Sequence, residues 1–278
     1  MKHREMQFPG CHETTLRAQA WLPERGPRAV IVISHGLAEH GGRYQGLAER
    51  LVSEGYAVYA LDHRGHGRSD GRRANIDRFD YLVSDLGTFI GRAQREHPGA
   101  QAILIGHSMG GAIALAAALR YFGSLRGLVL SAPALAAGEA VPALKLAMIK
   151  VLSVIAPNTG ALTLPAAAIS RDAAVVRAYE DDPLVHRGPI PARTLAELLQ
   201  AMKTLQARAH ELRLPVLVQH GTDDSLVPIA AVHPIYQHLG ASTSRTLHAY
   251  EGLFHEVYNE PERERVIGDL LTWLAARR

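Results

Sequence analysis

The sequence predicts an α/β fold, with a mostly parallel central sheet, helices on both faces of that sheet and an inserted helical cap. Short apolar runs alternate with helical patterns in two separate stretches of the chain, which is typical of parallel strands joined by helices. The alternation stops between residues 133 and 213, where the pattern is helical. With 278 residues, of which 47% are hydrophobic, the chain is long enough for one large domain with an insertion.

The first stretch supplies four predicted strands and three predicted helices. Uninterrupted apolar runs predict buried strands at 29–34, 56–61, 102–105 and 127–131. Apolar residues at helical spacing predict helices at 44–54, 77–96 and 112–119. Gly55 stands where the first helix is expected to end in a left-handed residue, Asp77 is expected to cap the second, and Pro98-Gly99 ends it.

The alternation resumes near the C-terminal end of the chain. It predicts a strand at 215–220, a helix at 229–239 closed by Gly240, a strand at 245–250 and a last helix opened by Pro261. We therefore divide the chain into a first core part (1–132), the inserted helical cap or lid (133–213), which is rich in alanine and repeatedly broken by proline, and a second core part (214–278).

The composition excludes several classes of protein. The net charge is only +3 and arginines alternate with acidic residues, as in 262–265, so we expect no nucleic-acid partner. We also expect no signal peptide and no transmembrane segment, and hence a cytoplasmic protein, because the first residues are polar and no apolar run could span a bilayer. The single cysteine, Cys11, excludes an internal disulfide and suits a reducing compartment. The sequence sets no oligomeric state.

The pentapeptide Gly106-His107-Ser108-Met109-Gly110 lies between a predicted strand and a predicted helix. In so tight a turn the two backbones approach each other on both sides of the serine, so the flanking positions need glycine. Ser108 would be held at the apex with its hydroxyl exposed above the sheet. This pattern is a nucleophile elbow and predicts hydrolysis of an ester or amide. A phosphate-binding loop is excluded because no lysine follows the second glycine.

A serine nucleophile needs a base and a group that orients the base. In this type of fold the order along the chain is serine, acid, histidine, each on a loop after a strand. His255, in the loop after the predicted strand 245–250, is the expected base. His248 lies within that strand and His107 beside the nucleophile, and we expect both to be structural.

The residues alone do not decide which aspartate orients the histidine. Asp223 and Asp224 are neighbours in the loop after the strand 215–220, and their side chains cannot point the same way. Asp62 is a third candidate, but its arginine-rich surroundings favour a structural ion pair. The negative oxygen of the intermediate needs two backbone donors, which we expect to be the N–H groups of Leu37 and Met109.

A metal site is an alternative interpretation because His63 and His66 are three residues apart and His35 and His40 are near in sequence. Zinc sites usually add cysteines or a third convergent ligand, so we predict no metal and interpret 64–68 as a packed turn.

Four separated motifs agree in order and spacing with a known family. They are Ser34-His35-Gly36-Leu37-Ala38-Glu39-His40-Gly41-Gly42-Arg43-Tyr44, Asp62-His63-Arg64-Gly65-His66-Gly67-Arg68-Ser69, Gly106-His107-Ser108-Met109-Gly110-Gly111 and Phe254-His255-Glu256. Together they resemble the monoacylglycerol lipases of the α/β-hydrolase superfamily, particularly the bacterial ones, from about Leu16 to the C-terminus.

The resemblance implies the α/β-hydrolase fold and a triad of Ser108, Asp224 and His255, since the family's acid stands three residues after the glycine that is Gly221 here. It also implies Leu37 and Met109 as oxyanion donors, no cofactor, and cleavage of a monoacylglycerol to glycerol and a fatty acid. The alternatives are a broader carboxylesterase or lysophospholipase, a serine aminopeptidase and a ligand-binding homologue without activity. A peptidase would need acidic groups for a free amino terminus, such as Glu180-Asp181-Asp182.

The cap contains one stripe of apolar residues at helical spacing: Val141, Leu144, Met148, Val151, Leu152 and Ile155, with Lys145 and Lys150 on other faces. Two hypotheses follow. The stripe lines an acyl tunnel or makes a transient contact with a membrane or micelle, or it packs on the core as an ordinary amphipathic helix.

Overall fold

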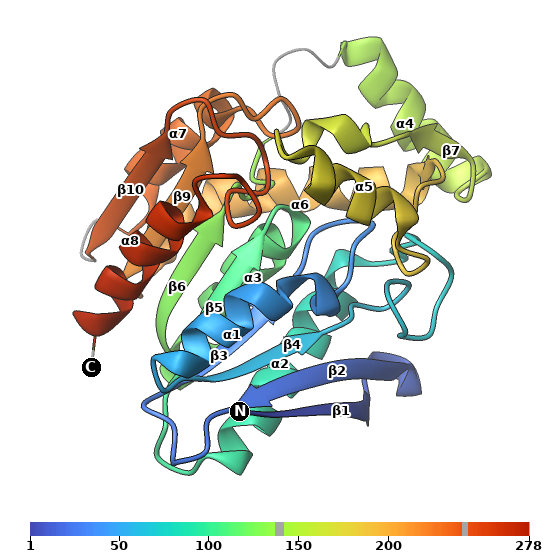
Figure 1. The fold of residues 1–278 in the computed structure, drawn as a ribbon. Helices are drawn as coiled ribbons and strands as arrows, with labels where there is room; N and C mark the ends of the chain where they lie inside the picture. Colours follow the sequence, from blue (N-terminus) through green and yellow to red (C-terminus); the bar gives the residue numbers. More distant parts are fainter. Residues whose placement is uncertain (137–141, 241–243, 278) are drawn as a thin grey trace.

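The structure, a computed structural model, describes residues 1–136, 142–240 and 244–277. Its centre is one eight-stranded sheet (Figure 1). The strands, in sheet order, are β1 (Lys2–Pro9), β2 (Thr15–Leu22), β4 (Ala57–Leu61), β3 (Val30–Ser34), β5 (Ala102–His107), β6 (Leu125–Ser131), β9 (Val216–Gly221) and β10 (Arg245–Tyr250). From β4 to β10 all neighbouring strands are parallel, which confirms the predicted mostly parallel sheet.

Helices cover both faces of the sheet, as predicted. The core helices are α1 (Gln45–Ser53), α2 (Phe79–Glu96), α3 (Met109–Arg120), α7 (Ile229–His238) and α8 (Arg263–Ala275). Alternate residues of the central strands, such as Ile31 and Val32, enter two different buried clusters, one shared with α1 and α8 and the other with α2, α3 and α7. The central strands are therefore buried on both faces, which is why they are continuous apolar runs.

Two strands of the central sheet, and a short strand pair in the inserted segment, were not predicted. β1 and β2 pair antiparallel with each other, and β2 joins the sheet antiparallel to β4. Leu16, Ala18 and Ala20 are buried in β2 while Arg17 is exposed, so the strand alternates with a period of two. The short side chains of two alanines make this alternation weak in the sequence, because alanine has little preference for strands.

The prediction that Asp77 caps the N-terminus of α2 is wrong. The helix begins at Phe79 rather than Asp77, and its N-cap residue, Arg78, makes no side-chain capping bond. The backbone N–H of Phe79 instead donates to Glu197 Oε2 at 2.9 Å, from a helix more than one hundred residues later in the chain. A tertiary contact thus replaces the local cap, and a local pattern cannot reveal such a contact. Gly55 has a φ of +87°, which confirms the left-handed residue after α1.

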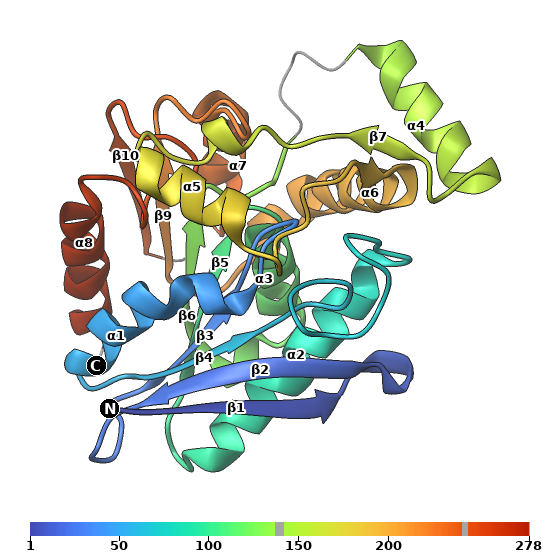
Figure 2. The ribbon, with the colours of Figure 1, turned by 45° about the vertical axis from the view of Figure 1, so that its right-hand side comes forward.

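The inserted segment lies above the carboxyl edge of the sheet (Figures 1 and 2). It holds α4 (Ala143–Ile155), α5 (Ala173–Asp181) and α6 (Ala192–Arg208), with a short strand pair of β7 (Gly160–Leu162) and β8 (Ile190–Pro191). Figure 2 shows that α4 packs on α6 and lies farther from the sheet than α6 does. Helix α6 lies across α3 and shares its buried cluster through residues such as Met202. The division of the chain at residues 133 and 213 stays a prediction.

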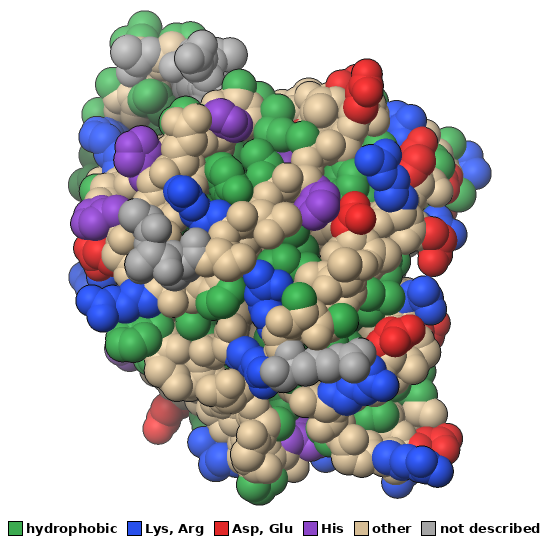
Figure 3. Space-filling view, turned by 90° about the vertical axis from the view of Figure 1, so that its left-hand side faces the viewer, with side chains coloured by type: hydrophobic (Ala, Val, Ile, Leu, Met, Phe, Trp, Pro, Cys, Tyr) green, Lys and Arg blue, Asp and Glu red, His purple; other side chains and the backbone are tan. Residues whose placement is uncertain are grey.

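The molecular surface has a mixed charge. On the face over β10 and α8, basic and acidic side chains are interspersed (Figure 3). Within the described part of the chain, no helix is both long enough and apolar enough to cross a bilayer.

Candidate active site

Ser108 lies at the turn between β5 and α3, where the elbow was predicted. Its backbone has φ 52° and ψ −122°, a conformation that costs a residue other than glycine about 1–3 kcal/mol. The surrounding chain holds it there, because Ser108 N donates to Ser131 O at 3.0 Å and Ala134 N donates to Ser108 O at 2.9 Å. The side chain stays partly exposed while its neighbours are buried. The strand, turn and helix of the prediction are therefore confirmed.

The glycines around the serine are required by close backbone approach. A Cβ atom on Gly106 would lie 2.5 Å from Ala114 Cβ, and one on Gly110 would lie 2.1 Å from the carbonyl oxygen of Ser34. The second contact is with backbone and has no flexible partner that could move aside. These glycines let β3, β5 and α3 meet beneath Ser108.

Gly110→Ala is expected to lower the free energy of unfolding by more than about 4 kcal/mol, because the new methyl group overlaps the backbone of the loop after β3. Gly268→Ala is the matched control: it lies in α8 with no atom within 4 Å of the new Cβ, and it should gain about 0.5–1 kcal/mol from helix propensity. Urea unfolding measures both. A Gly110→Ala midpoint equal to that of the wild type would contradict the close approach.

The loops after β9 and β10 bring Asp224 and His255 together. His255 Nδ1 lies 2.7 Å from Asp224 Oδ2, and Asp224 Oδ1 accepts the backbone N–H groups of Leu226 and Val227, each at 2.9 Å. Burial raises the pKa of Asp224, but hydrogen bonds from His220 and His255 outweigh it and hold that pKa well below its usual range. Asp224 is buried, whereas Asp223 is exposed and accepts the Thr222 hydroxyl.

His220, which sequence reasoning did not single out, braces this aspartate. Its Nε2 lies 2.7 Å from Val227 O and 3.2 Å from Asp224 Oδ2. The side chain is fully buried, so its N–H has only these two acceptors within reach among the described residues. The signal in the sequence was its place at the end of β9, one residue before the acid-bearing loop.

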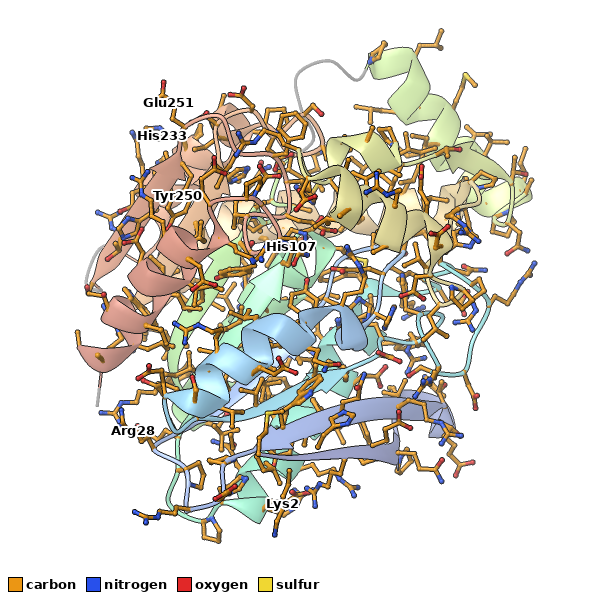
Figure 4. The ribbon with its side chains drawn as sticks, viewed as in Figure 1. Lys2, Arg28, His107, His233, Tyr250 and Glu251 are labelled. Carbon is orange, nitrogen blue, oxygen red and sulfur yellow. The ribbon has the colours of Figure 1, made fainter. Side chains whose placement is uncertain are left out.

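His107 contacts His255 ring to ring. The ring centroids are 4.6 Å apart, and His107 Nδ1 lies 3.1 Å from Ser131 Oγ. Figure 4 places His107 at the end of β5, beneath the inserted segment. Burial and the neighbouring His255 lower the pKa of His107 to about 4, so it is neutral at pH 7. The prediction of a purely structural role thus omitted a contact with the candidate base, whereas His248 lies away from the site, 3.7 Å from Asp269.

The loop after β3 lies against Ser108. A Cβ atom on Gly36 would be only 3.2 Å from Ser108 Cβ. Leu37 follows directly, and Met109 is the first residue of α3, where unpaired backbone N–H groups and the positive end of the helix dipole meet. Leu37, Ser108, Met109 and His255 all line one cavity of about 230 Å³.

The walls of this cavity are of two kinds. One part is apolar and comes from the inserted segment, with Leu146 and Ile149 of α4 and Leu195, Leu198 and Met202 of α6. The other part is polar and comprises Glu39, His107, Tyr179 and Glu256. Glu39, Glu256 and Tyr179 surround Arg43, and these four residues are called the Arg43 cluster below. Sequence reasoning did not identify this cluster.

Asp62 does not form the predicted ion pair. Its carboxylate accepts the backbone N–H groups of Gly41 at 2.8 Å and Arg68 at 2.9 Å. The arginine therefore contributes its main chain, and Asp62 ties two loops together. The expectation of an ion pair was wrong because the sequence does not show whether the main chain or the side chain of a neighbouring arginine faces the carboxylate.

His35, His63 and His66 form a buried group behind the loop after β3. His63 N donates to His35 Nε2 at 2.9 Å, and His63 Nε2 lies 2.9 Å from Ser34 Oγ. Among the described residues, no three side chains of the metal-binding types converge as a metal site. Burial lowers the pKa of His35 to about 4 and that of His66 to about 3, and it holds that of His63 well below its usual value.

This group is expected to make the fold sensitive to acid. In the folded protein the pKa values of these histidines lie below 6.5, the value in the unfolded chain. As the pH falls below 6.5, the unfolded chain therefore binds more protons than the folded protein, and the free energy of unfolding decreases. The decrease ends only when the pH is below the folded pKa values. The free energy of unfolding should fall by about 1 kcal/mol per histidine between pH 6.5 and 5.5. Urea unfolding at both pH values, with His248→Asn as the control, measures it. An unchanged free energy of unfolding would contradict the prediction.

The eight-stranded sheet, the inserted helices and a serine, a histidine and an aspartate at the carboxyl edge define the α/β-hydrolase class. A family model described as serine aminopeptidase, S33, matches residues 25–262. A monoacylglycerol lipase of Mycolicibacterium smegmatis is 41% identical over 98% of this chain and 97% of its own length. The monoglyceride lipase of Homo sapiens is 34% identical over 92% of this chain and 86% of its own.

A solved structure agrees with these relatives. The crystal structure of Paleococcus ferrophilus monoacylglycerol lipase superposes with a TM-score of 0.82 and 30% identity, and the alignment covers 100% of both chains. The chain belongs to the monoacylglycerol lipase family.

Proposed function

We propose that this protein is a carboxylic ester hydrolase that cleaves monoacylglycerols to glycerol and a fatty acid. The observation that carries the proposal is the two-sided lining of the cavity around Ser108 and His255. Apolar side chains of α4 and α6 suit an acyl chain, and the buried polar groups suit a leaving group rich in hydroxyls. A monoacylglycerol has this division within one small molecule, with its ester bond at the junction.

The proposed mechanism uses Ser108, Asp224 and His255 as a triad. His255 Nε2 takes the Ser108 proton as Oγ attacks the ester carbonyl, while Asp224 holds Nδ1–H. The N–H groups of Leu37 and Met109 bind the negative oxygen of the tetrahedral intermediate. The intermediate collapses, and glycerol leaves with the proton from His255. Water, activated by the same imidazole, then releases the fatty acid and restores Ser108. No step requires a metal or cofactor.

The charges of the cavity favour an ester over a peptide substrate. A free amino terminus needs an unpaired carboxylate, but Glu39 and Glu256, the carboxylates that line the cavity among the described residues, both bind Arg43. Of the acidic cluster considered for a peptidase, Asp182 accepts a hydrogen bond from His40 at 2.9 Å, and its two acidic neighbours are exposed.

Fatty-acid release is the test of the substrate. Monooleoylglycerol, trioleoylglycerol, a lysophospholipid and an aminoacyl amide are compared at equal concentration, and kcat/KM is expected to be highest for monooleoylglycerol. A higher value for the lysophospholipid or the amide would overturn the substrate assignment but leave the serine mechanism in place.

We also propose that residues 133–213 act as a cap and that α4 makes transient contact with a membrane or micelle. Within α4, Leu144 is 74% exposed and Ile155 is 73% exposed, and Met148 and Val151 are more than half exposed, so these side chains do not pack on the core. Ile149 is buried and lines the cavity. The stripe thus offers one face to solvent, while Leu146 and Ile149 of the same helix line the cavity. Val141, the first member of the expected stripe, lies outside the described residues.

Leu144→Asp and Met148→Asp are each expected to weaken binding to micelles or phosphatidylcholine vesicles about tenfold, because a buried apolar side chain is worth about 1.5–3 kcal/mol. Co-sedimentation measures the bound fraction. Phe122→Asp is the matched control: Phe122 is 52% exposed but follows α3, outside the inserted segment. Unchanged vesicle binding and unchanged chain-length preference in folded variants would remove the lipid role.

A further inference from the structure

Arg43 joins two carboxylates in a nearly dry environment. Its guanidinium donates to Glu39 Oε2 at 2.8 Å and to both oxygens of Glu256 at 2.6 and 2.8 Å. The three side chains are only 5–10% exposed. Burial raises the pKa of Glu39, but the charge of Arg43, the neighbouring histidines and the hydrogen bond from Gly36 together outweigh burial and lower that pKa to about 2, so the group is ionised. The proposed mechanism gives Arg43 no step and uses Glu39 and Glu256 only as part of the polar wall of the cavity.

The two carboxylates of the Arg43 cluster, Glu39 and Glu256, contact different loops of the site. Glu39 Oε1 accepts the backbone N–H of Gly36 at 2.6 Å, one residue before Leu37. Glu256 follows His255 directly in the chain, and its Oε2 also accepts Asn259 Nδ2 at 2.8 Å. The ends of the cluster therefore hold the loop of the proposed oxyanion donor and the loop of the proposed base.

The cluster also reaches the inserted segment. The Arg43 guanidinium carbon lies 4.8 Å from the centre of the Tyr179 ring in α5. The backbone N–H of Glu256 donates to Ile169 O at 2.8 Å, just before α5. Glu256 is thus held both by its side chain and by its main chain, directly beside His255 in the chain.

We infer that Glu256 is a positioning residue, whose two-pronged bond to Arg43 sets the distance between the imidazole of His255 and the oxyanion loop at Leu37. This inference rests on the proposed mechanism. His255 is otherwise held by Asp224 on Nδ1 and by the His107 ring, and neither contact is a hydrogen bond or an ion pair between its loop and the loop of Leu37. A guanidinium suits this link because its planar fork donates to both oxygens of Glu256 while it also donates to Glu39, whereas an ammonium is a point charge without that fork.

The test compares Glu256→Gln, Arg43→Lys and the double variant in steady-state kinetics, with 4-nitrophenyl butyrate and with monooleoylglycerol. Each single variant is expected to lose about 10- to 100-fold in kcat with KM within about threefold, since a displacement near 1 Å has such an effect on a reacting group. Because both changes break one link, the double variant should be no slower than the slower single variant. Glu262→Gln is the control. Glu262 is close to Glu256 in the sequence and also pairs with an arginine, Arg171, but it is 46% exposed, so kcat of this variant should stay within twofold of wild type.

A kcat within twofold of wild type in Glu256→Gln, a loss confined to KM, or effects of the two changes that multiply would each overturn the inference. If Glu256→Gln does not fold, as judged by circular dichroism, Arg43→Lys must still show the loss of kcat, and full activity there overturns it. A wild type that cleaves the nitrophenyl ester but not monooleoylglycerol would refute the substrate assignment alone.

Discussion

Ser108→Ala is expected to lower kcat for ester hydrolysis by about 10⁵-fold or more, with rates near those that the remaining site supports without a nucleophile. The reason is that the proposed acyl-enzyme cannot form, whereas the backbone donors and the cavity remain. Initial rates with 4-nitrophenyl butyrate and monooleoylglycerol measure the effect. Because the enzyme contributes only the proton acceptor and the oxyanion donors in this variant, loss of kcat should far exceed any change in KM.

Ser225→Ala is the matched control, since Ser225 is exposed on the loop of Asp224. It should keep wild-type rates. Alanine retains the Cβ atom, so Ser108→Ala leaves the backbone strain at φ 52° in place and the melting temperature should change little. Activity that survives in folded Ser108→Ala would refute the assignment of the nucleophile.

Asp224→Asn is expected to lower kcat about 10⁴-fold, because the amide no longer accepts Nδ1–H firmly and the imidazole turns to the wrong tautomer. Asp223→Asn is a control at the next position. Its carboxylate is exposed and bonds only Thr222 among the described side chains, so we expect less than a twofold change. The pair of variants is compared by kcat at pH 8, with circular dichroism to confirm the fold. A larger loss in Asp223→Asn than in Asp224→Asn would reverse the assignment.

The elbow could be predicted because its determinants are local. Gly106, Ser108 and Gly110 form a short segment, and the strand before it and the helix after it are strongly patterned. The place of His255 in the loop after β10 was also predictable, since the order of loops along the chain is set by the alternation of strands and helices. The buried parallel strands were found for the same reason, because burial on both faces requires continuous apolar residues.

The Asp223 and Asp224 pair could not be separated from the residues alone. Both are aspartates, and which of them turns inward depends on the path of the loop after β9. In the structure that loop buries Asp224 beneath two backbone N–H groups and turns Asp223 to solvent. The resemblance to monoacylglycerol lipases favoured Asp224, and the contact with His255 agrees with it.

The Arg43 cluster was beyond prediction for another reason. Arg43 and Glu39 are four residues apart, but Glu256 joins them across more than two hundred residues of chain. Charged residues at such positions are usually exposed, and their burial is known only once β3, β10 and α5 have been brought together. The same holds for Glu197, which replaces Asp77 as the acceptor at the start of α2.

The sequence by itself determined the class of fold, the tight turn at Ser108 between a strand and a helix, and the loops that hold the other residues of the proposed triad, because backbone sterics and the alternation of apolar residues act over short distances. Only the tertiary structure decided which aspartate faces His255, that His107 and His220 brace the site, and that α4 turns apolar side chains to solvent. These depend on contacts between segments far apart in the chain, where packing and desolvation of buried charges outweigh local preference.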